Sequence, residues 1–196
     1  MVFLELQKIE KKMDGKYLSF YNLHYKNRLG NEKIYELVSH NHSIESGEDL
    51  YNQQAEAVVM IVLDRLHDHI LLNKEFRMGV NSYVYNTPCG LVENGESYLD
   101  AVTRELKEET GLDLIRVVTV MGPSYSSVGI SNEKTICVIC EAEGVLGGNP
   151  EPDEEIECAW YSKEAIRRML EDCRHGTGLL MGARSQMFCY MWCMGL

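Results

Sequence analysis

The most constraining feature of this sequence is a helical pattern between residues 98 and 110. Leu99, Val102 and Leu106 recur at helical spacing and fall on one side of such a helix, while charged residues are displaced from that side. Residues that cap helices stand at the two ends of the segment: Ser97, Asp100 and Gly111. The sequence therefore predicts an amphipathic helix over 98–110.

Three glutamates lie on one face of this predicted helix and repel one another. Glu105, Glu108 and Glu109 stand at positions i, i+3 and i+4, so their carboxylates share a single turn. Arg104 can pair with Glu108, but one guanidinium does not neutralise three carboxylates, and clustered hard oxygen ligands suit Mg²⁺ or Mn²⁺. A solvated acidic face is the alternative. It is disfavoured because further spaced residues surround the triplet in a fixed order: Gly90, Gly95, Glu96 and Gly111.

Strand and helix patterns are mixed along the rest of the chain, as in an α/β or α+β protein. Strands are predicted at residues 17–25, 33–40, 57–63, 70–76, 117–121, 135–143 and 156–161. Further helices are predicted from about residue 162 and over 183–193. Since 196 residues is a single-domain size, we expect an N-terminal antiparallel β extension over 1–55 and one domain over 56–196.

Charge and cysteine content bear on the compartment and the partners. The formal net charge of −11 repels phosphate backbones and anionic lipids, so neither nucleic acid nor a membrane is expected as a partner. No targeting segment is expected, and the longest apolar run, Ala57–Leu63, is far too short for a membrane span. Seven cysteines, an odd number, favour a reducing cytoplasm. Cys137 and Cys140 would point to opposite faces of a strand, which favours packing over metal binding.

The segment from Gly90 to Leu112 matches every position of the Nudix box, G-x5-E-x7-R-E-U-x-E-E-x-G-U, where U is a bulky aliphatic residue. The sequence thus resembles the Nudix hydrolase superfamily. Its flanks resemble the ADP-ribose and ADP-sugar pyrophosphatase branch, at Lys74–Arg77, Pro88–Gly90 and Ser124–Glu133. The resemblance implies a Nudix-type α/β/α sandwich with a mixed sheet, in which the box forms a loop, a helix and a loop.

The resemblance also implies a set of metal ligands. Glu105 and Glu109 would bind the metal directly, and Glu108 would bind a further cation or its water. The Cys89 carbonyl would be a backbone ligand, and Glu154 falls on a metal-ligand position of the loop after the box. The implied cofactor is Mg²⁺, with Mn²⁺ as an alternative, and the number of ions stays open.

Other residues would support the ligands or contact the substrate. Glu96 and Arg104 would orient the ligands, because an arginine fixed among carboxylates limits their repulsion. Arg77 would approach the substrate diphosphate. Ser131 and Glu133, at the end of a Ser-x-x-Gly-x-Ser-x-Glu segment, match positions that contact substrate or orient water in the relatives.

Three acids compete for the role of general base. Relatives often take the base from a loop after the box, and Glu133, Glu151 and Glu154 all lie there. Pro152 stands where a glutamate base is expected, with Glu151 one residue away. The base therefore stays unassigned.

The activity implied is hydrolysis of a nucleoside diphosphate linked to another group, with ADP-ribose or a related ADP-sugar cleaved to AMP and a sugar phosphate. Many ADP-ribose hydrolases have proline where this chain has Val128, so UDP- and GDP-sugars remain alternative substrates. A non-catalytic nucleotide sensor on the same fold is a further alternative, and the intact box argues against it. The implied partners are this small molecule and a second copy of the chain, whose N-terminal extension helps to enclose the nucleoside.

Two groups of residues outside the box have competing interpretations. Tyr17, Tyr21 and Tyr25 share one face of a predicted strand, where they would either stack on a purine or pack a dimer. The sequence does not decide between these two roles. The H-x-H pairs that begin at His40 and His67 are expected to lie on the surface.

Overall fold

The chain forms two compact units. The structure, a computed structural model, describes residues 4–51, 54–148 and 154–195. The first unit comprises Met1–Glu56 and Pro123–Thr135, and the second comprises Ala57–Gly122 and Ile136–Leu196. The N-terminal segment therefore shares its unit with a segment that follows the box in the sequence.

The first unit contains an antiparallel sheet of three strands in the order β1-β2-β3. Their bounds are Leu4–Asp14 for β1, Ser19–Asn27 for β2 and Glu32–Ser39 for β3. Gly30 lies in the turn between β2 and β3 with a φ of 80°, a left-handed conformation that favours glycine. The strands predicted at 17–25 and 33–40 are confirmed. The sequence pattern does not predict β1, because its side chains are mostly exposed and its pairing with β2 holds it in place.

A small hydrophobic core supports this sheet. It consists of four buried side chains: Tyr21, Leu23, Leu37 and Ile44. Tyr21 is completely buried, and its hydroxyl donates a hydrogen bond of 2.9 Å to the backbone oxygen of Asn41. Tyr25 packs partly against the same core, whereas Tyr17 precedes β2 and is exposed. Neither purine stacking nor dimer packing therefore applies to Tyr21, and that expectation is wrong because the side chain fills the unit's own core.

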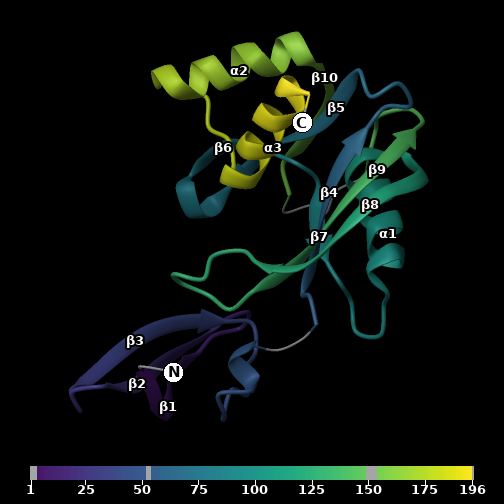
Figure 1. Ribbon diagram of the computed structural model, residues 1–196. Coiled ribbons are helices and arrows are strands. Elements are labelled where there is room, and N and C mark those ends of the chain that lie inside the picture. Colours follow the sequence, from purple (N-terminus) through teal and green to yellow (C-terminus); the bar gives the residue numbers. More distant parts are fainter. Residues whose placement is uncertain (1–3, 52–53, 149–153, 196) are drawn as a thin grey trace. The chain divides into compact units, whose positions relative to one another are not determined.

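The second unit is built around a mixed seven-stranded sheet with the order β10-β5-β4-β9-β8, in which β6 pairs with β5 and β7 with β4. The strands are β4 (Ala57–Leu63), β5 (His69–Arg77), β6 (Ser82–Asn86), β7 (Cys89–Leu91), β8 (Asp113–Tyr125), β9 (Lys134–Glu143) and β10 (Ile156–Ser162). β5 is antiparallel to β4, β6 and β10. β4 and β9 lie side by side and run in the same direction (Figure 1).

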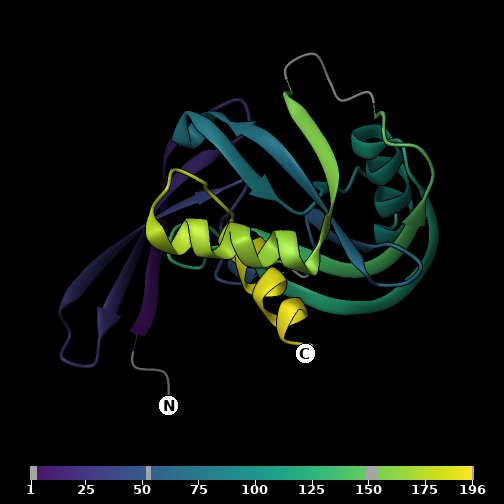
Figure 2. The ribbon, with the colours of Figure 1, turned by 90° about the horizontal axis from the view of Figure 1, so that it is seen from above.

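Helices cover both faces of this sheet. They are α1 (Tyr98–Thr110), α2 (Lys163–His175) and α3 (Ala183–Met194). Figures 1 and 2 show α1 on one face and α2 with α3 on the other. Side chains of β4 alternate between the two layers, since Met60 packs in the core with α1 and Ile61 in the core with α2 and α3. Cys140 and Cys137 divide in the same way, so the predicted α/β/α sandwich and the opposed cysteines are confirmed.

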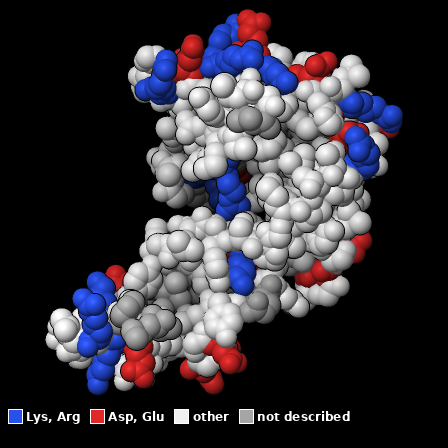
Figure 3. All heavy atoms as spheres, viewed as in Figure 1, with Lys and Arg blue, Asp and Glu red and all other residues white. Residues whose placement is uncertain are grey.

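The helices on the second face differ in character. α2 is amphipathic: Ile166 and Met169 are buried, while Lys, Arg, Asp and Glu side chains cover its outer surface (Figure 3). α3 is apolar on most sides, with Cys189 and Trp192 buried and Met187 exposed. Within the described ranges, none of the helices is long and apolar enough to cross a membrane.

All seven cysteines are free thiols. The three buried ones are Cys137, Cys140 and Cys189. The four half-buried ones are Cys89, Cys158, Cys173 and Cys193. Burial raises the pKa of every one of these thiols, in three cases to about 12. The cysteines therefore serve as small packing residues in this fold.

Candidate active site

The predicted caps hold α1 at both ends. Ser97 Oγ accepts a hydrogen bond of 3.2 Å from the backbone N–H of Asp100. At the other end Gly111 has a φ of 77°, and its N–H donates to the backbone oxygen of Lys107. Leu106 is completely buried against the sheet, which fixes the rotation of the helix. The face that carries the three box glutamates is thereby held in one orientation.

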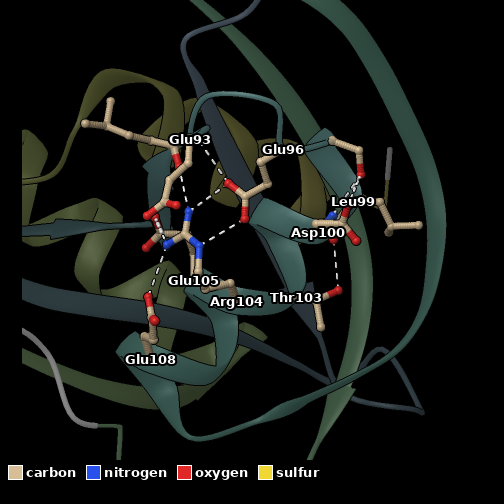
Figure 4. A network of polar contacts seen from close by, with 10 residues as sticks. Glu93, Glu96, Leu99, Asp100, Thr103, Arg104, Glu105 and Glu108 are labelled. Carbon is tan, nitrogen blue, oxygen red and sulfur yellow. Dashed lines mark hydrogen bonds and ion pairs between the residues drawn. The ribbon is translucent and has the colours of Figure 1, made fainter.

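Arg104 connects the box loop to the helix (Figure 4). Its Nε and Nη2 donate to the two carboxylate oxygens of Glu96, each at 3.0 Å. Its Nη1 donates to Glu105 at 2.8 Å and to Glu108 at 3.1 Å, and Nη2 also reaches the backbone oxygen of Leu91. The sequence predicts the pair with Glu108, and the structure adds the other contacts. One guanidinium therefore fixes three carboxylates and the loop backbone together.

Glu105 lies tightly against strand β7. A Cβ atom at Gly90 would stand 1.9 Å from Glu105 Cδ, so glycine is required there for the carboxylate to approach. Burial raises the pKa of Glu105, and the negative charges of Glu108 and Glu154 act in the same direction. The Arg104 guanidinium opposes this rise without cancelling it.

Glu109 is the most deeply buried carboxylate of the box, with 8% of the residue exposed. Burial raises its pKa to about 8, and the charges of Glu105, Glu75 and Glu154 contribute to the rise. Asn73 Nδ2 donates a hydrogen bond of 2.8 Å to Glu109 Oε2, which favours the ionised form. A cation bound beside this carboxylate would stabilise its ionised form.

Strand β5 supplies the predicted Arg77 and two residues to which the sequence assigns no role, Asn73 and Glu75. Asn73, Glu75 and Arg77 alternate along one face of β5, and Asn73 and Glu75 are buried. Glu75 accepts hydrogen bonds from Asn86 Nδ2 and from Arg77 Nη1, the latter at 3.3 Å. The signal that could have found them is the two-residue spacing that puts Asn73 and Glu75 on the same strand face as Arg77.

The pKa of the Cys89 thiol indicates that these side chains lie close together. Burial raises its pKa to about 12, and the charges of Glu109 and Glu75 add to the rise while that of Arg77 opposes it. β5, β7 and α1 thus place Glu75, Arg77 and the box glutamates close enough for their charges to affect one another.

The remaining predicted residues lie in loops. Glu154 precedes β10, and its charge raises the pKa of Glu105 and of Glu109, so the structure brings it near the acidic site that these two residues form with Glu108. Glu151 lies outside the described residues. Ser131 and Glu133 belong to the first unit, where both line a cavity of about 240 Å³. The Glu133 N–H donates to Ser131 Oγ at 3.4 Å.

The donor chemistry of the site fits a hard divalent cation. Among the described residues, no three His, Cys, Asp or Glu side chains already converge on one metal position. The box carboxylates nevertheless repel one another, and Asn73 Oδ1 is buried beside Glu109 with no hydrogen-bond partner among the residues that the structure describes. A hydrated Mg²⁺ or Mn²⁺ would relieve both the repulsion and the unsatisfied oxygen. The residues present therefore suit such an ion.

Fold and site together define an α/β/α sandwich protein in which Arg104 joins the acidic helix α1 to the glycine-containing loop that precedes it. The NUDIX domain model matches residues 54–177, so the chain belongs to the NUDIX domain family and is a Nudix hydrolase. The family resemblance seen in the sequence is confirmed.

Several relatives share a large part of the chain. ADP compounds hydrolase NudE of Escherichia coli is 35% identical over 52% of this chain and 53% of its own length. ADP-sugar pyrophosphatase of Mus musculus is 33% identical over 71% of this chain and 62% of its own. An uncharacterised Nudix hydrolase of Schizosaccharomyces pombe is 27% identical over 81% of this chain and 74% of its own. The chain thus spans between about half and three quarters of the length of these relatives.

A solved structure shows the same fold. The crystal structure of an ADP compounds hydrolase superposes with a TM-score of 0.74, at 20% sequence identity. The match covers 100% of this chain and 96% of that one. The predicted Nudix-type fold class is therefore confirmed.

Proposed function

We propose that this protein hydrolyses ADP-ribose or a related ADP-sugar to AMP and a sugar phosphate, with Mg²⁺ or Mn²⁺ as cofactor. The observation that carries the proposal is the complete set of box carboxylates, clamped by Arg104 and joined by Asn73 and Glu154. The names of the Escherichia coli and mouse relatives, which refer to ADP compounds and ADP-sugars, support this substrate class.

In this proposal the metal is held by the acidic site. Glu105 and Glu109 are the direct ligands, Glu108 and Glu154 hold a further ion or its water, and the Cys89 carbonyl completes the set. A bound Mg²⁺ lowers the pKa of its water and neutralises negative charge on phosphate oxygens. The chain itself is acidic, so its attraction for a diphosphate depends on cations held this way.

Arg77, Ser131 and Glu133 contact the substrate in this scheme. Arg77 donates to the diphosphate, which a guanidinium matches in geometry and charge. Water adds its oxygen to one phosphorus while the bridging P–O bond breaks, and a carboxylate takes up the proton that the water loses. Glu133, Glu151 and Glu154 are the candidates for that base.

A substrate panel tests the proposal. The purified protein with Mg²⁺ is incubated with ADP-ribose, other ADP-sugars, UDP-glucose and GDP-mannose, and products are separated by anion-exchange chromatography. We expect AMP and ribose 5-phosphate to appear fastest from ADP-ribose. A faster UDP- or GDP-sugar would move the substrate class, and no hydrolysis of any compound would favour a nucleotide sensor.

A charge-neutral variant tests the metal site. Glu109→Gln keeps the shape of the side chain but removes the negative charge, so turnover should fall by orders of magnitude. Glu164→Gln, at an exposed position of α2, is the matched control and should leave turnover unchanged. Wild-type turnover in Glu109→Gln would show that Glu109 holds no metal.

We also propose a cytoplasmic homodimer in which residues 1–55 contribute to the subunit contact and to the substrate pocket. Seven free thiols fit a reducing compartment. Light scattering tests the oligomeric state. A monomer mass at micromolar concentration would contradict the dimer.

A further inference from the structure

We infer that Glu75 is a positioning residue that holds Arg77 for the substrate diphosphate, an inference that rests on the proposed function. Glu75 sits in the middle of the β5 face between Asn73 and Arg77. It is 7% exposed, whereas the Arg77 side chain is 57% exposed. The strand thus places the buried carboxylate of Glu75 next to the accessible guanidinium of Arg77.

Both carboxylate oxygens of Glu75 are used. Oε1 accepts from Asn86 Nδ2, and Oε2 accepts from Arg77 Nη1 at 3.3 Å. A buried carboxylate is costly unless it is paired and hydrogen-bonded, so Glu75 favours the conformation in which Arg77 Nη1 contacts it, while 57% of the Arg77 side chain stays exposed. Within the part of the chain that the structure describes, the contact with Glu75 uses Nη1 alone, so the other donors of the guanidinium can bind a phosphate.

Asn86 is itself held in place by contacts at the start of α3. Ser185 Oγ lies 3.5 Å from Asn86 Oδ1, and the same hydroxyl accepts a hydrogen bond of 2.9 Å from the Thr87 N–H. A Cβ at Gly182 would stand 2.0 Å from Asn86 Oδ1, so the residue before α3 must be glycine to leave this side chain in place. The start of α3 therefore supports Asn86, which supports Glu75.

Glu75 also faces the acidic site. Its charge contributes to the raised pKa of Glu109 and of the Cys89 thiol. The carboxylate lies close enough to the box to influence it electrostatically, yet its two oxygens are committed to Asn86 and Arg77. Its role is therefore to set where Arg77 stands relative to the box glutamates.

A double-mutant cycle tests this role in the full-length protein with Mg²⁺. Glu75→Gln removes the charge that attracts Arg77, so KM for ADP-ribose should rise about tenfold while kcat changes less. Arg77→Ala should raise KM further. If Glu75 acts through Arg77, the double variant will match Arg77→Ala within about twofold. Additive effects, or a wild-type KM in Glu75→Gln, would overturn the inference.

The control and a second readout separate this inference from the proposed function. Glu157→Gln removes an exposed ion pair with Lys74 on the adjacent position of β5 and should leave KM unchanged. Calorimetry with ADP measures affinity without turnover, and Glu75→Gln should weaken it about tenfold. If the wild type binds ADP but hydrolyses no nucleotide, the proposed function is contradicted. The ratio of the ADP affinities of the wild type and of Glu75→Gln still decides the role of Glu75 in that case. A wild type that binds no ADP would overturn the inference.

Discussion

Arg104 reaches several acceptors at once because a guanidinium presents five N–H donors in one plane. Its contacts with Glu96, Glu105, Glu108 and the Leu91 carbonyl use three nitrogen atoms that diverge from a rigid centre. A lysine has one nitrogen on a flexible stem and could not hold the loop and the helix together. This one side chain thus joins the loop to the helix at the acidic site.

Gly90 permits a direct test of how closely Glu105 must approach β7. In Gly90→Ala the added methyl group would push the Glu105 side chain out of the position in which Arg104 holds it, and because the nearest atoms belong to a side chain rather than to the backbone, the fold should remain intact. A displacement of about 1 Å at a reacting centre costs on the order of 10²-fold in rate. We expect turnover to fall by about that factor with a nearly unchanged melting temperature. Gly79→Ala, whose Cβ would meet open space, is the control, and equal turnover in both variants would contradict the prediction.

Glu109 makes stability depend on pH when no cation is bound. Its pKa is 4.5 in the unfolded chain and about 8 in the folded protein. Between these values the folded protein retains a proton that the unfolded chain has lost, so its contribution to stability falls as pH rises from about 5 to 8. The effect is a few kcal/mol at most. Urea unfolding in EDTA at several pH values measures it, and a Glu109→Gln variant with the wild-type slope would refute this assignment.

The candidate site could be predicted where its contacts are local and not where they cross between elements. Arg104 and the box glutamates share one helical turn, so their spacing already implies their proximity. Asn73 contacts Glu109, 36 residues further along the chain, and Glu75 contacts Asn86 on the adjacent strand β6. Those contacts depend on how β5 packs beside α1 and β6, which no local pattern reports.

At the scale of elements, capping sets the bounds of α1. Ser97 caps α1 and Ser162 caps α2 through equivalent side-chain hydrogen bonds. Replacing either serine by alanine should lower the free energy of unfolding by about 1 kcal/mol. Ser97→Ala should also lower turnover, because the box lies on α1, whereas Ser162→Ala should not. Chemical denaturation and kinetics check both, and an equal loss of turnover would contradict a special role for α1.

The elements with strong periodicity or caps could be predicted from the sequence. The helix expected over 98–110 is observed with the same bounds, and the apolar runs became β4, β5, β9 and β10. The weaker elements could not be predicted, since β7 has three residues and β6 has five, and both exist through pairing with β4 and β5. The order of strands follows from those long-range pairings, which periodicity does not encode.

At the scale of the whole molecule, the two units have separate hydrophobic cores. Leu23 belongs to the core of the first unit and Leu72 to a core of the second. We expect two transitions in calorimetry, with Leu23→Ala lowering one and Leu72→Ala the other. Each substitution should cost about 2–5 kcal/mol in its own unit. A single transition that both variants lower equally would show that the units unfold together.

The raised pKa of the cysteine thiols has a practical consequence for labelling. Maleimides and similar reagents attack the thiolate, which a raised pKa keeps scarce at neutral pH. All seven native cysteines share that property. A cysteine introduced at an exposed position such as Val145 would react first, so a single fluorescent dye could be attached without removing any native cysteine.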